Sequence, residues 1–398
     1  MFRGYRYRFY PTPTQELLLR RTIGCCRLVY NKALWQRSEA WTSGKKSLTY
    51  NDQSRALTAW KKTEGLSFLN EVSSVPTQQA LRHLQTAYSN FFAKRAKYPS
   101  FKKRRNGGSA EFTRSGFRLN KGEIYLAKLK EPLAIRWSRP LPKDALPTSV
   151  TVSMDAAQRW HISILCDDPT IVPLGQTSSV VGVDVGITHL ATLSTGEKIA
   201  NPRHDNREMA RKRMLSKRYA RTKKGSKNRE KAQLKLARLH ARIADRRRDH
   251  LHKLSTRLVH ENQVIVVEDL NISGMVRNRS LARHISDVSW GELIRQLEYK
   301  CSWYGRKFVR VDRWFPSSKT CSSCGYIVDR LDLSTRHWQC KSCGSHHDRD
   351  HNAAKNILAA GLAVTACGSD VSQSVFLDAL RSGVKQEDLV VKPGISVL

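Results

Sequence analysis

Two C-x2-C cysteine pairs separated by 15 residues constrain the fold of this chain more than any other feature. The four residues are Cys321, Cys324, Cys340 and Cys343. Paired C-x2-C turns are typical of a structural zinc site, because they present four thiolates to one tetrahedral ion. The acidic run HDRDHNAAKNI follows at once. The sequence therefore predicts a zinc knuckle that leads directly into a segment bearing two carboxylates, Asp348 and Asp350.

The net charge limits the class of partner. Lys and Arg number 70 against 34 Asp and Glu, which gives a formal net charge of +36. The like charges on such a surface repel one another. Binding to a polyanion is favourable, because the cations of the protein displace the counterions of the polyanion. Nucleic acid is therefore the first partner predicted, and an anionic membrane surface is the alternative.

The hydropathy pattern predicts neither a membrane span nor a signal peptide. No run of about 18 apolar residues occurs, and the start, MFRGYRYRFYPTP, lacks an apolar core. Both features favour the cytoplasm, where thiols stay reduced, so zinc is preferred over disulfides for the clustered cysteines. The five other cysteines are interpreted as buried apolar side chains: Cys25, Cys26, Cys166, Cys301 and Cys367.

The first half of the chain predicts strands around a helical insertion. Residues 2–10 alternate aromatic and basic side chains, which is the period of a strand. One helix is predicted from Thr14 as its N-cap, and another runs from Pro76 through Phe92. Short strand-like segments follow at 117–119, 123–126, 133–137, 149–154 and 160–165. They predict a small antiparallel barrel that the first strand closes, with the helices of residues 14–95 inserted between strands.

Two basic segments are predicted to contact phosphates. Residues 97–109 form a glycine-containing basic loop, and residues 203–259 form a helical region with 21 Lys and Arg against five acids. Leu251, Leu254 and Leu258 mark the apolar stripe of this region, and its opposite face carries almost one sign of charge. The predicted contacts are Lys102, Lys103, Arg104, Arg211, Lys212, Arg213, Arg246, Arg247 and Arg248.

Acidic side chains stand in two apolar strands of the second half. Asp184 lies within VVGVDVG and Glu268 closes VIVVE, and both patterns are typical of strands buried on two faces. A buried carboxylate needs a cation partner. Like charges about 4 Å apart would repel by about 4 kcal/mol at an effective dielectric of 20. Bound Mg²⁺ removes this penalty and can serve phosphodiester hydrolysis, so convergence of these acids predicts a magnesium site.

The third acid of such a site is open on the residues alone. Asp350 stands at the start of a predicted helix, where the amide dipoles favour an anion. Asp348 lies two residues away, does not share its helical face and is suited to capping the helix. Asp269 follows Glu268 and points to the opposite face of the strand.

Four segments of the chain resemble the TnpB (OrfB) family of RNA-guided nucleases, which insertion sequences encode and which are similar to type V CRISPR effectors. These segments are VGVDVGITHLATL, VIVVEDLNISGM, PSSKTCSSCG and CKSCGSHHDRDHNAAKNIL. The resemblance extends from FYPTPTQ to Ala360 and includes RRRDHLHKLS. PSSKTCSSCG with DRDHNAA is its specific part, whereas GVDVG alone is weak. The resemblance implies that the third acid is Asp350, beside Asp184 and Glu268.

The resemblance also implies an α+β multidomain architecture. An N-terminal wedge-like small β-barrel (1–12 and 97–170) would hold an inserted helical recognition domain (13–96). A C-terminal RNase H-like RuvC α/β domain (180–315 and 347–360) would hold an inserted zinc ribbon (316–346). Residues 361–398 lie beyond the resemblance and are interpreted as a flexible tail.

The activity implied is Mg²⁺-dependent cleavage of double-stranded DNA next to a short motif, directed by a guide-bearing RNA. A monomer would bind one RNA in the cytoplasm at the nucleoid, structural Zn²⁺ would hold the ribbon, and base pairing would read most of the target. The start of the second predicted helix is expected near the motif-bearing duplex, because amide side chains can read adenine edges. The residues expected there are Thr77, Gln78 and Gln79.

Two other functions are weighed against this one. A nuclease-inactive, guided repressor is disfavoured because all three acids are present. A transposase or transposase accessory role is disfavoured because the chain has no obvious nucleophilic tyrosine in a His-hydrophobe-His setting.

Overall fold

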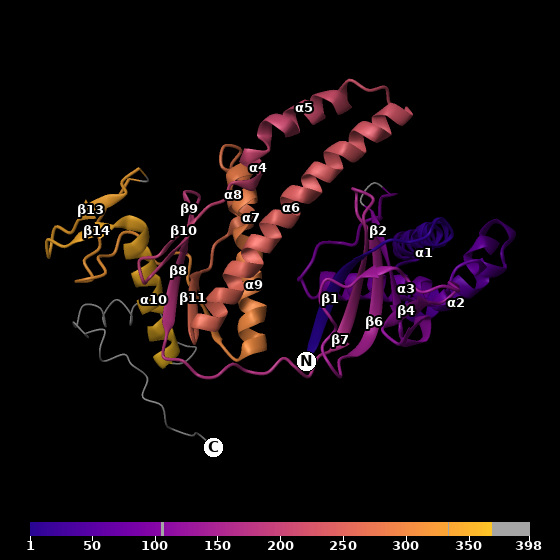
Figure 1. The fold of residues 1–398 in the computed structure, drawn as a ribbon, viewed down its shortest axis with the longest axis horizontal. Helices are drawn as coiled ribbons and strands as arrows, with labels where there is room; N and C mark the ends of the chain where they lie inside the picture. Colours follow the sequence, from indigo (N-terminus) through magenta and orange to yellow (C-terminus); the bar gives the residue numbers. More distant parts are fainter. Residues whose placement is uncertain (105–106, 333, 368–398) are drawn as a thin grey trace, which may run out of the picture. The chain divides into compact units, whose positions relative to one another are not determined.

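The computed structural model describes residues 1–104, 107–332 and 334–367, which fall into two compact units. One unit contains Met1–Thr170 with Leu215–Leu239, and the other contains Ile171–Met214 and the chain from His240 onward. Each unit has its own five-stranded sheet and apolar core. Figure 1 labels the elements. The α+β class predicted from the sequence is confirmed.

An antiparallel sheet with strand order β2-β6-β7-β1-β5 organises the first unit. Its strands are β1 (Phe2–Phe9), β2 (Gly108–Thr113), β5 (Ile135–Arg136), β6 (Leu146–Met154) and β7 (Trp160–Asp167). A separate hairpin pairs β3 (Phe117–Asn120) with β4 (Glu123–Leu126). β1 pairs with β7 and β5 inside the sheet, which leaves β2 and β5 as edges among the described strands. The expected closure of a barrel by the first strand is therefore wrong.

The helices between β1 and β2 in the chain share the core of this unit. They are α1 (Pro13–Gly44), α2 (Tyr50–Lys62) and α3 (Ser74–Phe92), with a 3-10 turn η1 (Glu64–Asn70); a second turn, η3 (Arg114–Gly116), follows β2. The N-cap of α1 is Thr12 and not Thr14. The Thr12 hydroxyl accepts from the N–H of Gln15, whose side chain accepts from the N–H of Thr12. This capping box leaves Pro13 at the first helical position, which needs no N–H.

A mixed sheet with strand order β10-β9-β8-β11-β12 organises the second unit. Its strands are β8 (Val180–Val185), β9 (His189–Leu193), β10 (Lys198–Ala200), β11 (Val264–Glu268) and β12 (Lys307–Val311). β8, β11 and β12 are parallel, whereas β9 and β10 join antiparallel. The two apolar runs predicted as buried strands are thus neighbours in one sheet.

Helices cover both faces of this second sheet. They are the later part of α6 (Lys227–Glu261), α7 (Ile272–Met275), α8 (Ala282–Val288), α9 (Trp290–Tyr304) and α10 (Arg349–Cys367). Two further helices, α4 (His204–Arg207) and α5 (Met209–Ala220), precede α6 in the chain. Val181, Val183 and Ile265 share a core with α6 and α9, whereas Val266 and Val309 share a core with α10. Figure 1 shows α10 and α9 on opposite sides of the strands. The prediction of strands buried on both faces is confirmed.

Two further segments differ from their predictions. The basic region of residues 203–259 is three helices, because a turn containing Gly225 (φ 81°) separates α5 from α6. Helix α10 continues through residues 361–367, where a flexible tail was predicted. A Cβ at Gly361 would lie 2.3 Å from Cγ1 of Val266, so close packing on β11 extends the helix beyond residue 360. Residues 368–398 lie outside the described chain.

Candidate metal sites and nucleic-acid contacts

Asp184 and Glu268 point to the same face of the second sheet. Val183 of β8 pairs with Val267 of β11, and both side chains belong to the core shared with α6 and α9. Because side chains alternate along a strand, the next residue on each strand faces the other way. Asp184 and Glu268 are those next residues, so both face the side covered by α10.

Gly182 allows α10 to approach β8 closely. A Cβ at this position would lie 2.2 Å from the carbonyl oxygen of Ala354 and 2.8 Å from Cβ of Leu358. No residue with a side chain fits there unless the helix moves. Asp350 lies in the first turn of α10. The close packing therefore brings its carboxylate toward the strand that carries Asp184.

Burial and mutual repulsion change the acidity of this group of carboxyls. Burial raises the pKa of Asp184 to about 8, with further contributions from the negative charges of Asp350 and Glu268, while the charge of Arg349 opposes them. Burial also raises the pKa of Glu268 to about 7. Among the described residues, no Lys, Arg or His forms an ion pair with Asp184 or Glu268. The charges of Glu268 and Asp350 thus both act on Asp184, and a divalent cation would supply the missing positive charge.

The two rival acids have other partners. Asp348 accepts from the N–H of His351 (3.0 Å) and from Nζ of Lys198 (2.6 Å), so it caps α10, as predicted. Asp269 forms ion pairs with Arg310 (3.2 Å) and Arg313 (3.0 Å). Their charges are therefore compensated within the protein.

Two arginines near the acids were missed in the sequence. Nη1 of Arg336 lies 3.5 Å from Oδ1 of Asp350, and Arg349 donates to the carbonyl of Asp332 (2.6 Å) while its charge acts on Asp184. The position of Arg349 between two acids in HDRDH was an available signal. The sequence carried no signal for Arg336, because its contact depends on how the cysteine knuckle folds back.

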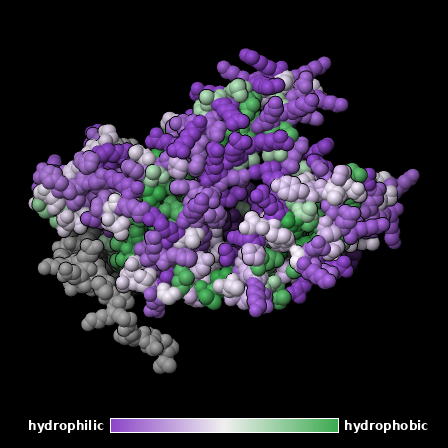
Figure 2. All heavy atoms as spheres, in the orientation of Figure 1, coloured by the Kyte–Doolittle hydropathy of each residue, from purple (hydrophilic) through white to green (hydrophobic). Residues whose placement is uncertain are grey.

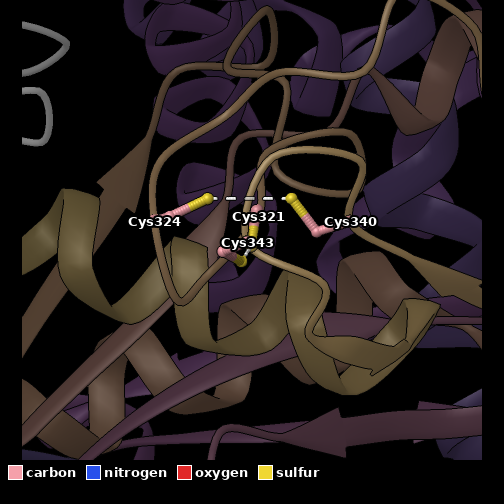
Figure 3. A group of neighbouring side chains, drawn as sticks. All are labelled: Cys321, Cys324, Cys340 and Cys343. Atoms are coloured by element: carbon pink, nitrogen blue, oxygen red, sulfur yellow. Dashed lines mark hydrogen bonds between the residues drawn. The ribbon is translucent and has the colours of Figure 1, made fainter.

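The four cysteines form one cluster. Their sulfur atoms all lie within 4.8 Å of one another and point toward a common centre (Figure 3). The Sγ atoms of Cys321 and Cys343 are 3.7 Å apart, and so are those of Cys324 and Cys340. A tetrahedron with zinc–sulfur bonds of about 2.3 Å has sulfur–sulfur edges of about 3.8 Å. The thiol positions therefore fit a tetrahedral metal ion of the size of zinc.

Each cysteine pair closes the same tight turn. The N–H of Gly325 donates to the carbonyl of Cys321, and the N–H of Gly344 donates to that of Cys340, both at 2.9 Å. The glycine φ angles are 76° and 73°, a left-handed conformation that favours glycine. The strands β13 (His337–Gln339) and β14 (His346–Asp348) pair beside the second turn.

The remaining cysteines of the described chain are buried, as predicted: Cys25, Cys26, Cys166 and Cys301. The side chain of Cys367 lies outside the described part.

The predicted phosphate contacts of the second basic segment divide into paired and unpaired residues. Lys212 pairs with Asp205 (2.7 Å), Arg246 with Glu208 (3.1 Å), Arg247 with Asp287 (2.9 Å) and Arg248 with Asp245 (3.7 Å). Lys212 and Arg247 are half-buried, so these pairs brace the helices, and the phosphate contacts predicted at these two positions stay predictions. Arg211 and Arg213 are exposed. Hydrophilic side chains predominate over α5 in Figure 2.

The basic loop of the first unit presents an exposed cationic surface. Lys102, Lys103 and Arg104 are all exposed. Asn31 fixes the backbone of Lys102 through two hydrogen bonds of 2.8 and 3.0 Å. Lys102 and Lys103 line a pocket of about 480 Å³ with Arg27, Tyr30 and His83, among other residues. This loop thus retains the accessibility that the prediction requires.

The predicted motif-reading residues of α3 differ in accessibility. Thr77 is completely buried and its hydroxyl donates to the carbonyl of Ser74 (2.8 Å), so its prediction as a DNA contact is wrong. Gln78 exchanges hydrogen bonds with Tyr50 and Ser54 at 3.2–3.4 Å, and Gln79 is half-buried. Packing of α3 against the sheet and the other helices decides this difference.

Comparison with known proteins places this chain in an established class. Three family models match: "Helix-turn-helix domain" of OrfB over residues 1–46, "Probable transposase" OrfB_IS605 over 161–279, and "Cas12f1-like, TNB domain" over 290–357. These models define a protein of the insertion-sequence OrfB class.

Full-length relatives identify the family. A "Putative RNA-guided DNA endonuclease" of Streptomyces pristinaespiralis is 57% identical over 99% of this chain and 98% of its own. The "Putative RNA-guided DNA endonuclease InsQ" of Escherichia coli (strain K12) is 35% identical over 92% of this chain and 94% of its own. The chain belongs to the TnpB (OrfB) family.

A solved structure shares the fold. The "Cryo-EM structure of the Cas12f1-sgRNA-target DNA complex" contains a chain that matches with a TM-score of 0.54 at 16% identity, over 86% of this chain and 82% of that chain. No helix in the described part of the chain has the length and apolar character that a membrane span requires.

Proposed function

We propose that this protein is an RNA-guided DNA endonuclease that binds a guide-bearing RNA and cleaves DNA beside a short motif with the help of Mg²⁺. The observation that carries the proposal is the group of three acids around Asp184, two of them on adjacent strand ends and one on the helix that covers them. The relatives named as RNA-guided DNA endonucleases support the guided activity.

Asp184, Glu268 and Asp350 would hold the metal ions. Bound Mg²⁺ would supply the positive charge that activates a water and stabilises the leaving oxygen of the phosphodiester. The carboxylates fit this task because Asp184 and Glu268 have no ion-pair partner among the described residues and have raised pKa values. Arg336, whose Nη1 lies 3.5 Å from Oδ1 of Asp350, would orient that carboxylate.

The architecture we propose follows the two sheets. Residues 1–12 and 97–170 form the wedge-like part and residues 13–96 the helical recognition part. Residues 180–315 and 347–360 form the RuvC-like nuclease, with a zinc ribbon over 316–346. The cluster of four thiols with the spacing of a tetrahedral zinc site supports the ribbon.

The proposed partners are one guide RNA and a double-stranded DNA target. The formal charge of +36 supports binding to both polyanions. Four of the predicted cations are exposed and accessible to phosphates: Arg211, Arg213, Lys102 and Lys103. Gln78 and Gln79 are the side chains of α3 that we propose to read base edges near the motif.

Cleavage by the purified protein with its copurified RNA, matched target DNA and Mg²⁺ tests this function. We expect Asp184→Ala to lower the rate of cleavage by at least about 10³-fold, because removal of a metal ligand removes much of the transition-state stabilisation. Asp269→Asn is the matched control, since Asp269 follows Glu268 but is paired with two arginines. It should cut at the wild-type rate.

Binding of the target measured in parallel separates the rival functions. Guided binding without any cut product in Mg²⁺ would identify a repressor, and full cleavage by Asp184→Ala would refute the assignment of the site. Strand-transfer products in the same reaction would instead identify a transposase.

A further inference from the structure

The chain that enters the first cysteine turn is attached to the first turn of α10. Asn352 accepts a hydrogen bond from the N–H of Ser322 (2.9 Å) and donates to the carbonyl of Thr320 (2.7 Å). These two partners are the neighbours of Cys321 on either side. One side chain of α10 thus holds the backbone on both sides of a zinc-ligand candidate.

Asn356 extends this attachment by one helical turn. Its side chain donates to the carbonyls of Ser317 (2.8 Å) and Thr320 (2.6 Å). Asn352 is 2% exposed and Asn356 is 4% exposed, so water cannot replace the partners of this asparagine pair. Leaving a buried polar group without its partner costs about 1–3 kcal/mol. The helix and the entering segment are therefore strongly coupled.

The second cysteine turn reaches α10 by a different route. β14 follows the second cysteine pair and continues directly into α10. Nε2 of His347, in the middle of β14, lies 3.0 Å from Sγ of Cys321. Both halves of the four-cysteine cluster are thus connected to the start of the helix.

The same first turn positions Asp350. This residue lies two positions before Asn352, and the helix is pressed against β8 where Gly182 leaves space. A displacement of the first turn of α10 would consequently move the carboxylate of Asp350 relative to Asp184 on the sheet. Metal sites lose affinity when a ligand shifts, because the ion requires defined ligand distances.

We propose that Asn352 and Asn356 are positioning residues that link metal occupancy of the four-cysteine cluster to the divalent-ion affinity of the carboxylate site. Without the ion the cysteines take up protons again, and the knuckle loses the free energy of metal binding. The asparagine pair transmits the resulting shift of the Cys321 turn to the first turn of α10. This inference rests on the proposed function, since it concerns the same three acids.

Binding of Mn²⁺ to the full chain without nucleic acid tests the link, with electron paramagnetic resonance of free Mn²⁺ as the readout. Wild type and Asn352→Ala are compared, each with zinc bound and after zinc removal and dialysis. In wild type, zinc removal should weaken Mn²⁺ binding about tenfold. This change equals a free energy near the lower end of the cost of losing one buried hydrogen bond. With zinc still bound, Asn352→Ala should bind Mn²⁺ as weakly as zinc-free wild type does. Removal of zinc from this variant should weaken its Mn²⁺ binding only a little further.

Asn262→Ala is the matched control. Asn262 is also buried (8% exposed) and donates to the carbonyl of Leu258 at 2.9 Å, but this hydrogen bond only joins the residue after α6 to the last turn of the same helix. This variant should keep the wild-type affinity for Mn²⁺ and the wild-type response to zinc removal. Zinc content and far-UV circular dichroism are recorded for every sample. If Asn352→Ala does not fold, Asn356→Ala takes its place, because it leaves the hydrogen bonds of Asn352 in place.

Three outcomes overturn the link. The first is wild-type Mn²⁺ affinity in the folded variant, and the second is an equal effect of zinc removal on variant and wild type. The third is an absence of Mn²⁺ binding in wild type, or binding that Asp184→Ala leaves unchanged. Only this third outcome also overturns the proposed metal site, so the two failures are distinguishable.

Discussion

At the scale of single residues, the acids differ in how their charge is compensated. Asp348 has Lys198 at 2.6 Å, and Asp269 has Arg313 at 3.0 Å. Asp184 and Glu268 have no such partner in the described chain, and burial raises the pKa of each. Ionising them without a metal is therefore unfavourable in the folded protein, whereas the unfolded chain ionises them freely.

Asp184→Asn should stabilise the metal-free protein in a pH-dependent manner. The pKa of Asp184 rises from 3.8 to about 8 on folding, so its unfavourable contribution is absent below about pH 4 and grows until about pH 8. We expect the variant to be more stable than wild type by about 2 kcal/mol or more at pH 8, since one pKa unit corresponds to about 1.4 kcal/mol. Thermal unfolding in EDTA at about pH 4 and about pH 8 measures the difference in stability between the variant and wild type.

Two comparisons control this experiment. The difference between variant and wild type should nearly vanish at pH 4, and added Mg²⁺ should stabilise wild type more than Asp184→Asn. An equal difference at both pH values would contradict a raised pKa at this residue.

At the scale of elements, the contact between α10 and β8 decides whether the acids meet. The helix contributes Asp350, and the strand contributes Asp184. Gly182 sets their separation, because the backbone of Ala354 passes where a Cβ would stand. One missing side chain in a strand thus determines the geometry of a site built from distant segments.

Gly182→Ala should push α10 away from the sheet. We expect a loss of about 1–3 kcal/mol in the free energy of unfolding, which is typical of overpacking, and a fall in cleavage rate that exceeds the loss of folded protein. Denaturant unfolding and the cleavage rate at saturating DNA measure the two effects. Gly175→Ala is the control, because a Cβ there meets nothing within 4 Å; a wild-type result for both variants would refute the role of this contact.

At the scale of the whole molecule, the excess of positive charge governs association with nucleic acid. The 70 Lys and Arg far outnumber the 34 acids, and many of the cations are committed to internal ion pairs. A cation in an internal ion pair must give up that pair before it can neutralise a phosphate, whereas an unpaired cation need not. Exposure and pairing in the folded structure therefore identify the contacts better than a count of charges.

Arg213→Ala should weaken RNA binding and reduce its dependence on salt. Arg213 is exposed and has no ion pair in the described residues, so loss of one phosphate contact should lower the slope of log K against log salt by about 0.7–0.9. Filter binding from 50 to 400 mM salt measures the slope. Arg295→Ala is the control, because Arg295 pairs with Glu292 at 2.8 Å. Equal slopes for wild type and Arg213→Ala would show that this residue does not contact phosphate.

Local patterns explain why part of the fold was predictable. Residues 2–10 alternate with a period of two, and an apolar run surrounds Val266. Both patterns depend only on the local backbone conformation, and both segments are strands. The cysteine spacing likewise encodes two identical turns. The strand β2 was missed because GSAEFT lacks a strong alternation of apolar residues, and it becomes a strand by pairing with β6.

The sequence by itself determined the four-thiol cluster, the two buried strands with their acids and the class of partner, because spacing, period and net charge are local or summed properties. The tertiary structure alone decided which cations are available and that Thr77 is buried. Asp348 finds Lys198 and Asn352 finds Thr320 only after folding. Such contacts depend on distances between segments remote in the chain, which no local pattern specifies.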